Sequence, residues 1–192
     1  MTDKVKRQRF SKEEWLEAGL KVLAEQGVDK LTINSLSRTV GVARTSFYWY
    51  FKDRQDLLNH MLEYWASVFT LVVTENPQLL QLEPAERLQT IINTVIGQKL
   101  LKYELAVRAW ASHDESVKAV FDRIYSRRIA LLRQTFADAG FDGDEQEKRA
   151  QTFLCYLLWG GVMQGDPHSH KKIAEKMIPT LLKKQPYTSV TN

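Results

Sequence analysis

The chain has 192 residues, a formal net charge of +4 and a hydrophobic content of 44%. This composition is close to the globular average, so it excludes wholesale disorder and predicts a folded core. No apolar run approaches the ~20 residues that span a bilayer, and residues 1–10 lack the apolar stretch of a signal peptide. We therefore expect a cytoplasmic protein with no membrane association.

Almost every segment has the apolar spacing of a helix, and no stretch alternates like a strand. Ser11 and Glu14 have the spacing of a capping box at the start of the first helix. Thr32 and Asp53 have the side chains of N-caps, and Gly41 is placed where a short helix must end. We predict an all-α fold of about nine helices, at approximately 12–26, 32–40, 44–50, 54–74, 83–96, 105–111, 114–139, 144–165 and 169–184.

The pattern divides the chain into two predicted domains. Residues 1–55 contain the short helices, and the net charge of residues 1–56 is +3. Residues 56–192 contain the long amphipathic helices, and their share of the net charge is close to +1. A basic N-terminal domain suggests an anionic partner there.

The single cysteine, Cys155, excludes an intramolecular disulfide. It lies in the apolar run 153–159. We therefore expect it to be a small buried residue of the core, since unpaired cysteines are more often buried than reactive.

Residues 31–51, LTINSLSRTVGVARTSFYWYF, have the pattern of a helix-turn-helix. Two short helices meet at Gly41, and a tight turn of this kind redirects the chain so that the second helix enters the major groove of DNA. Leu36, Val42 and Phe47 are spaced to pack the two helices together.

The side chains left on the outside of this motif suit DNA. Arg44 can pair with a phosphate or with guanine O6 and N7, and the hydroxyls of Thr45 and Ser46 can approach base edges. Tyr48 and Trp49 can each donate a hydrogen bond to phosphate. A helix N-terminus and two flanking cations complete the predicted set: Thr32, Arg44, Thr45, Ser46, Tyr48, Trp49, Lys52 and Arg54.

Five consecutive aromatic residues, 47–51, end this motif. They cannot all face a core, because the apolar arc of a helix covers only part of each turn. We expect Phe47 and Phe51 to be buried and Tyr48 and Trp49 to be exposed. Exposed aromatic side chains beside basic ones indicate a binding partner.

These residues resemble the tetracycline-repressor (TetR) family. The family pattern begins with Gly-Val-Ser and continues with an apolar-Tyr-aromatic-His/Tyr-Phe block. A basic residue and a capped long helix follow. In this sequence the first part corresponds to Gly41-Val42-Ala43 and the second to residues 47–54. The likeness extends back to Ser11 and covers about a quarter of the chain. Ala43 replaces the usual Ser, which removes a cap or phosphate contact, and Tyr50 replaces a common His.

The resemblance implies an all-helical homodimer with one DNA-binding head per subunit and a larger C-terminal domain that binds a small inducer. Such a protein is usually a repressor that leaves its palindromic operator when the inducer binds. From the residues themselves, the apolar helix at 144–165 is the best dimerisation element, and Gly160, Gly161 and Gly165 would admit a close partner helix. A buried helix inside one subunit would have the same pattern. The predicted interface is Phe153, Leu154, Leu157, Leu158, Gly161, Met177 and Leu181.

An inducer pocket is predicted from aromatic and polar residues of the C-terminal domain. Arg108 lies in a mostly apolar helix, where it would bind an acidic inducer or, as we favour, pair with an acidic residue of the fold. The predicted pocket residues are Trp65, Phe69, Tyr103, Arg108, Trp110, Tyr125 and Trp159. Each of the aromatic ones also suits an ordinary core.

Other functions are less consistent with the sequence. It contains no Gly-rich phosphate loop, no H-E-x-x-H and no nucleophile elbow, so we predict no enzyme activity and no cofactor. His168 and His170 are expected in a solvated loop without metal. An architectural DNA-binding protein, or a regulator that senses a protein partner, remains as an alternative. A C-terminal domain without a cavity would favour a regulator that senses a protein partner. A polar-lined cavity of several hundred Å³ would favour a regulator that binds a small inducer.

Overall fold

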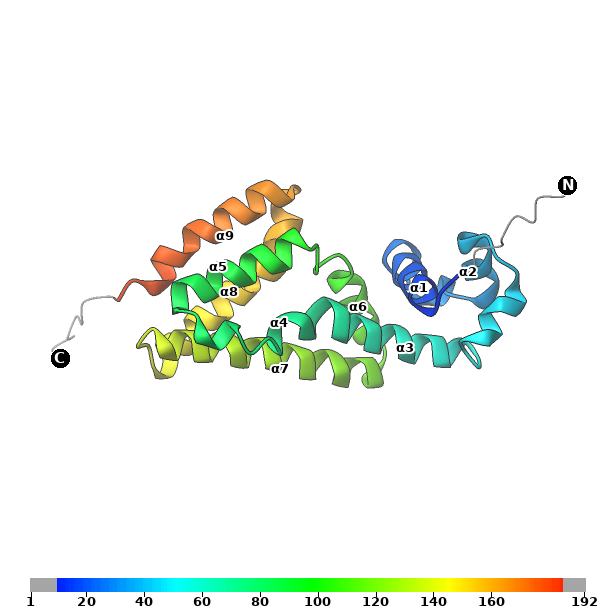
Figure 1. Ribbon diagram of the computed structural model, residues 1–192, viewed down its shortest axis with the longest axis horizontal. Coiled ribbons are helices and arrows are strands. Elements are labelled where there is room, and N and C mark those ends of the chain that lie inside the picture. Colours follow the sequence, from blue (N-terminus) through cyan, green and yellow to red (C-terminus); the bar gives the residue numbers. More distant parts are fainter. Residues whose placement is uncertain (1–9, 185–192) are drawn as a thin grey trace, which may run out of the picture. The chain divides into compact units, whose positions relative to one another are not determined.

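The computed structural model describes residues 10–184 (Figure 1). Within this range it consists of helices and turns and contains no strand, which confirms the all-α prediction with its nine α-helices. The helices are α1 (Lys12–Gln26), η1 (Val28–Lys30), α2 (Ile33–Val40), η2 (Arg44–Trp49), α3 (Arg54–Ala66), η3 (Ser67–Leu71), α4 (Val72–Thr74), η4 (Leu79–Gln81), α5 (Pro84–Gly97), α6 (Glu104–Ala111), α7 (Glu115–Asp138), α8 (Gly143–Gln164) and α9 (Pro167–Leu182).

The predicted helix ends in the N-terminal part are confirmed by their caps. Ser11 accepts a hydrogen bond from the backbone N–H of Glu14, and the Glu14 carboxylate accepts one from Ser11 N–H, so the capping box is complete. Gly41 ends α2 in the left-handed conformation, with φ of 71°. Asp53 caps α3 by accepting from Asp56 N–H.

Two later helices differ from the prediction. The helix expected at 54–74 comprises α3, a π-helical turn (η3) and α4. The last helix begins at Pro167, because Asp166 caps it by accepting from the N–H groups of His168 and Ser169. His168 and His170 therefore lie in α9, and the loop predicted for them is wrong.

The chain forms two compact units. The first contains the described residues up to Phe69 together with Tyr103–Phe121, and the second contains Thr70–Lys102 and the described residues from Asp122 onward. The predicted boundary between residues 55 and 56 separates two functions and not the two compact units, and α3 crosses it. This boundary stays a prediction.

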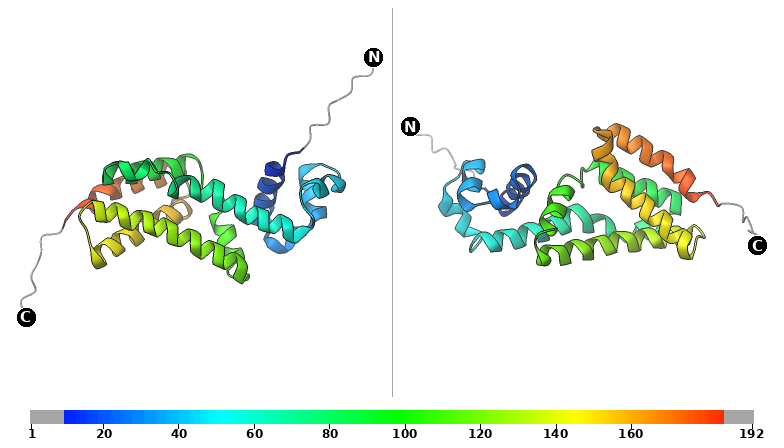
Figure 2. Two further views of the ribbon diagram at one scale, coloured as in Figure 1. Left: turned by 60° about the horizontal axis from the view of Figure 1, so that its bottom comes forward. Right: turned by 180° about the vertical axis from the view of Figure 1, so that it is seen from behind.

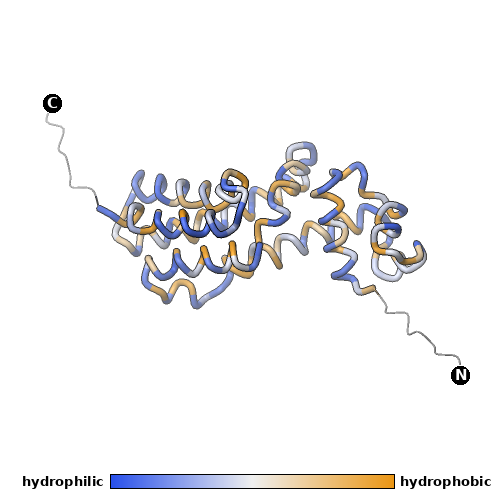
Figure 3. Tube along the Cα trace, turned by 90° about the horizontal axis from the view of Figure 1, so that it is seen from above, coloured by the Kyte–Doolittle hydropathy of each residue, from blue (hydrophilic) through white to orange (hydrophobic). Residues whose placement is uncertain are grey.

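In the first unit, α1 contacts α2, α3 and α6, and α2 contacts η2. Each helix alternates hydrophilic and hydrophobic segments along its trace, as amphipathic helices do (Figure 3). The core of this unit is built from large apolar side chains with essentially no exposure: Trp15, Leu20, Leu31, Leu36, Phe47, Leu57, Met61, Trp65 and Val107.

In the second unit, α9 lies beside both α5 and α8 (Figure 2). Gly160 of α8 permits this approach, because a Cβ atom at that position would lie 2.7 Å from Cδ2 of His170. Gly161 also faces the His170 ring. The small residues thus admit α9 of the same chain, whereas the sequence suggested that they admit a partner's helix.

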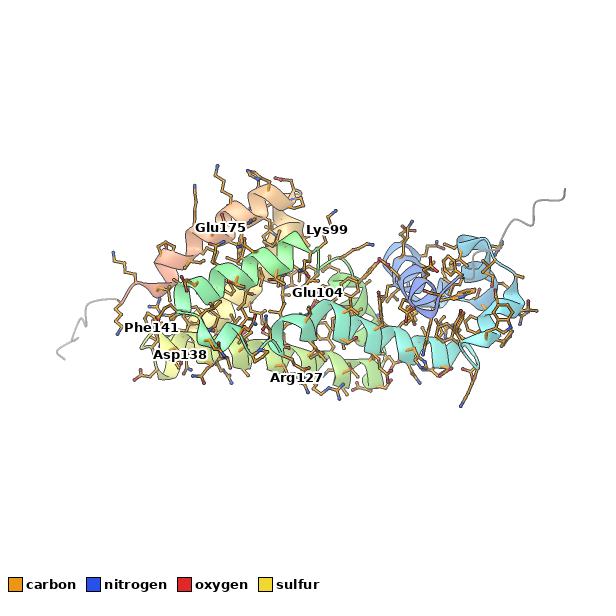
Figure 4. The ribbon with its side chains drawn as sticks, in the orientation of Figure 1. Lys99, Glu104, Arg127, Asp138, Phe141 and Glu175 are labelled. Carbon is orange, nitrogen blue, oxygen red and sulfur yellow. The ribbon has the colours of Figure 1, made fainter. Side chains whose placement is uncertain are left out.

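Lys99, after the end of α5, has a φ of 55° (Figure 4). A side chain with a β-carbon is strained in this region by about 1 kcal/mol or more. We expect Lys99→Gly to raise the free energy of unfolding by about 1 kcal/mol, as measured by urea denaturation. The control is Gln98→Gly, whose φ of −88° suits any residue, so that variant should be neutral or destabilised. Equal effects of the two substitutions would contradict strain at Lys99.

Candidate DNA-binding surface

The turn between α2 and η2 has the geometry of a helix-turn-helix. The N–H of Val42 donates to the carbonyl of Ser37, which closes the turn behind Gly41. Leu36 of α2 and Phe47 of η2 are fully buried, so the two short helices share one core. As a result, the opposite side of η2 faces solvent.

The run of aromatic residues splits as predicted. Phe47 and Phe51 are 0% and 2% exposed, whereas Tyr48 and Trp49 are 48% and 60% exposed. Phe47 packs edge-on against Trp15, with ring centroids 5.7 Å apart. The buried rings thus hold η2 in place, and the rings of Tyr48 and Trp49 lie on the surface.

The polar residues of η2 lie beside these exposed rings. Arg44 and Thr45 are exposed, and Arg44 Nη2 donates to Tyr48 Oη over 3.2 Å. Ser46 is half-buried, and its hydroxyl donates to the carbonyl of Ala43. Ala43, in the place of the family's usual Ser, makes no side-chain cap.

The other predicted contacts lie at helix starts. Thr32 is exposed at the N-terminus of α2, where its Oγ1 accepts from Ser35 N–H over 3.1 Å. Lys52 is exposed just before α3. Arg54 differs from the prediction, because its side chain is turned toward the protein. Its Nε and Nη2 donate to the carbonyls of Leu31 and Val28, each over 2.7 Å.

The predicted inducer residues are divided between the two compact units. Trp65, Tyr103 and Trp110 are buried in the first unit, with Phe69 half-buried edge-on against Tyr103. Trp65 stacks on Phe121 at a centroid distance of 5.8 Å. These contacts are those of an ordinary apolar core.

The remaining two aromatic residues of that set belong to the second unit. Tyr125 donates to Gln151 Oε1 over 2.7 Å, and Trp159 is 46% exposed. The exposure of Trp159 argues against a place for it in a closed pocket of a single subunit. The inducer site as a whole stays a prediction.

Arg108 is not the buried, acid-paired residue that the sequence suggested, and its role in an inducer pocket stays a prediction. Its side chain is exposed, and its guanidinium lies 5.3 Å from the ring centroid of Phe121.

The sequence does not predict the burial of Arg87 in α5. Arg87 is 1% exposed and donates to the carbonyls of Leu79, Leu80 and Leu82 and to Asp138. A guanidinium so satisfied has a structural role. No feature of the sequence around Arg87 signals its burial.

A groove of about 580 Å³ lies between α5 and α9. Two carboxylates and several apolar side chains line it, and Glu175 among them accepts from Gln89 Nε2 over 2.9 Å (Figure 4). None of the seven predicted inducer residues lines this groove. It is therefore separate from the predicted inducer site.

The predicted dimer interface needs correction. Phe153, Leu154, Leu157 and Leu181 are buried within the second unit, so they form the core of one subunit. Leu158, Gly161 and Met177 are half-buried. The apolar side chains that α8 and α9 leave exposed are different ones: Cys155, Trp159, Val162, Met163 and Ile173. Cys155 is thus exposed, contrary to the burial predicted for it.

The two histidines of α9 do not converge. His168 is exposed, whereas His170 is 3% exposed against Tyr156 and Gly160. Burial lowers the pKa of the His170 imidazole, because the charged form is poorly solvated there. Across residues 10–184, no group of three or more His, Cys, Asp or Glu is placed to hold a metal ion.

The fold and this surface define a helix-turn-helix regulatory protein. Residues 16–61 match the family model of the bacterial regulatory proteins of the tetR family. This match covers the helix-turn-helix region and the start of α3, about a quarter of the chain. None of the helices in residues 10–184 combines the length and apolar character needed to cross a membrane.

Known proteins resemble the chain in two ways. The transcriptional regulator AcrR of Shigella flexneri is 33% identical over 48 residues, which is 25% of this chain and 22% of that protein. The TetR-family regulator PfmR of Thermus thermophilus superposes with a TM-score of 0.71 over 92% of this chain and 98% of its own, at 14% identity. The reduced form of E. coli NemR does so with a TM-score of 0.68 over 91% and 99%, at 19% identity. The family model thus covers residues 16–61, and the structural matches show a common fold over most of the chain.

Proposed function

We propose that this protein is a sequence-specific transcriptional regulator that binds a palindromic operator as a homodimer and is released from it by a small-molecule inducer. The observation that best supports DNA binding is the exposed group of Arg44, Thr45, Tyr48 and Trp49 on a helix held rigidly by Phe47 and Phe51. Exposed arginine, hydroxyl and aromatic groups on one short helix match the chemistry of phosphates and base edges in the major groove.

The dimer is supported by the exposed apolar side chains of α8 and α9. Monomeric soluble proteins seldom leave such a stripe exposed, so a second copy is the expected cover. Two heads then read two half-sites, with a separation set by the dimer. An inducer that binds one dimer geometry more tightly shifts the population toward it and loosens the grip on DNA.

A selection of genomic fragments with the purified protein at several salt concentrations tests this function. Enrichment of a short palindrome, with an affinity that falls steeply with salt, would support a dimeric sequence-specific regulator. Uniform weak binding would favour an architectural protein. Absence of DNA binding at low salt would refute the proposal.

Tyr48→Ala is expected to weaken operator binding about tenfold or more, because it removes a phosphate contact and the hydroxyl that holds Arg44. Its dimer and helix content should not change, since Tyr48 is 48% exposed. Fluorescence anisotropy with a labelled operator measures the affinity. Val68→Ala, at a similarly exposed apolar position of the same unit, is the control. An unchanged affinity of Tyr48→Ala would remove Tyr48 from the DNA-binding surface.

A further inference from the structure

Arg54 joins two parts of the head that are far apart in sequence. It is the first residue of α3, and both of its carbonyl partners belong to the turn between α1 and α2. Nε donates to Leu31 and Nη2 donates to Val28, each over 2.7 Å. The guanidinium is therefore a clamp from the start of α3 onto this turn.

The clamped turn leads directly into the N-terminus of α2. Leu31 is fully buried, and the next residue, Thr32, is the exposed N-cap. Ser35 ties the same segment together, since its hydroxyl donates to the carbonyl of Lys30 over 2.7 Å. The place and direction of the α2 N-terminus thus depend on where Val28 and Leu31 are held.

We propose that Arg54 is a positioning residue for DNA binding, which holds the α2 N-terminus at Thr32 where it meets a phosphate. This inference rests on the proposed function. In this proposal Arg54 acts through Thr32, since its Nε and Nη2 donate to the two backbone carbonyls. The planar guanidinium presents two nitrogens in a fixed geometry to the two carbonyls, and the single nitrogen of a flexible lysine does not reproduce that geometry.

The geometry distinguishes the clamp from a direct phosphate contact. A direct contact needs mainly the positive charge, which Arg54→Lys retains. A clamp needs the fixed pair of donor nitrogens, Nε and Nη2, and Arg54→Lys replaces them with a single nitrogen on a flexible stem. The two roles therefore predict opposite results for the same substitution.

The test is a double-mutant cycle with Arg54→Lys, Thr32→Val and the combined variant of the full-length protein. Binding to a random-sequence DNA duplex is measured by anisotropy over a range of salt, which needs no knowledge of the operator. We expect Arg54→Lys to bind about tenfold more weakly, with a slope of log affinity against log salt that is shallower by about one phosphate. The combined variant should have the same affinity as the single variant of lower affinity, because both substitutions remove the same phosphate contact at the N-terminus of α2.

A matched variant separates positioning from loss of stability. Val22→Ala removes two methyl groups from the core of α1, where Val22 is 1% exposed, and should lower stability without changing the salt slope. Amide hydrogen exchange should quicken selectively at residues 28–36 in Arg54→Lys, and over the whole head in Val22→Ala. This measurement applies even if Arg54→Lys is too unstable for binding experiments.

Three results would overturn the inference: wild-type affinity and slope for Arg54→Lys, additive effects of the two substitutions, or exchange that quickens uniformly. Each of them leaves the proposed function intact. If the wild-type protein itself fails to bind the duplex at low salt, it is the proposed function that fails.

Discussion

Met163→Glu is expected to yield monomers at micromolar concentration and to weaken operator binding at least a hundredfold. Met163 is 80% exposed on α8, next to Val162 at 56% and near Trp159 at 46%. In a two-fold dimer each new carboxylate enters an apolar interface, and the substitution is repeated on both subunits. Burying an unpaired carboxylate costs more free energy than the contacts of one exposed methionine supply.

The affinity falls because a monomer binds one half-site only. The second head no longer benefits from the high effective concentration that a dimer gives it. Sedimentation equilibrium measures the mass, and anisotropy with the selected palindrome measures the affinity. Circular dichroism should show an unchanged helix content, since the side chain is on the surface.

Leu80→Glu is the control for Met163→Glu. Leu80 is 52% exposed in the same unit but lies on η4, which contacts α5, and not on α8 or α9. It should stay dimeric. A dimeric Met163→Glu variant would place the interface elsewhere. Leu157→Glu is unsuitable for this purpose, because Leu157 is buried and its replacement would unfold the subunit.

Arg87→Met is expected to lower the free energy of unfolding by about 3 kcal/mol. Arg87 Nε donates to Leu79 over 2.8 Å, and Nη2 donates to Leu80 and Leu82 over 2.9 and 3.0 Å. Methionine fills part of the volume but leaves these three carbonyls without their donor. The η4 turn, which Arg87 attaches to α5, should therefore loosen.

The ion pair of Arg87 with Asp138 contributes less to the free energy of unfolding than the hydrogen bonds of Arg87 to the three carbonyls. Arg87 Nη1 lies 2.7 Å from Asp138 Oδ2 and holds the pKa of the Asp138 carboxyl below its usual value. A lowered folded-state pKa means that this stabilisation is complete above the unfolded pKa, about 4, and is lost as pH falls through the folded value. Because the Asp138 side chain is 36% exposed, Asp138→Asn should cost only about 1 kcal/mol or less.

Chemical denaturation at fixed protein concentration measures both variants. Arg133→Met is the control, since the Arg133–Glu147 pair is exposed and should contribute almost nothing. If Arg87→Met is as stable as the wild type, the buried guanidinium has no net stabilising role, as is known for some buried ionic groups.

The prediction of Arg108 and the omission of Arg87 have one physical cause. Apolar neighbours in sequence do not decide which face of a helix is covered. In α6 the buried positions are Glu104, Val107, Trp110 and Ala111, and Arg108 falls outside them. Arg87 is buried because the η4 turn folds back over α5, and the carbonyls that satisfy it come from that turn.

The same reasoning applies to α8. The sequence shows that the helix is apolar on more than one side but cannot show which side α9 covers. The helical spacing therefore predicts an interface at Phe153 and Leu157, which are buried, and predicts burial for Cys155, which is exposed.

The sequence by itself determined most of the helices, the caps of α1, α2 and α3, the helix-turn-helix and the inward and outward sides of residues 47–51. These depend on local rules: side chains that cap nearby N–H groups, glycine in a left-handed turn, and the period of a helix. Only the tertiary structure decided that Arg54 turns inward, that Arg87 is buried, and that the exposed apolar stripe of α8 is the side opposite Leu157. Those outcomes depend on which elements meet, and contacts between distant segments are not encoded in the period of any one helix.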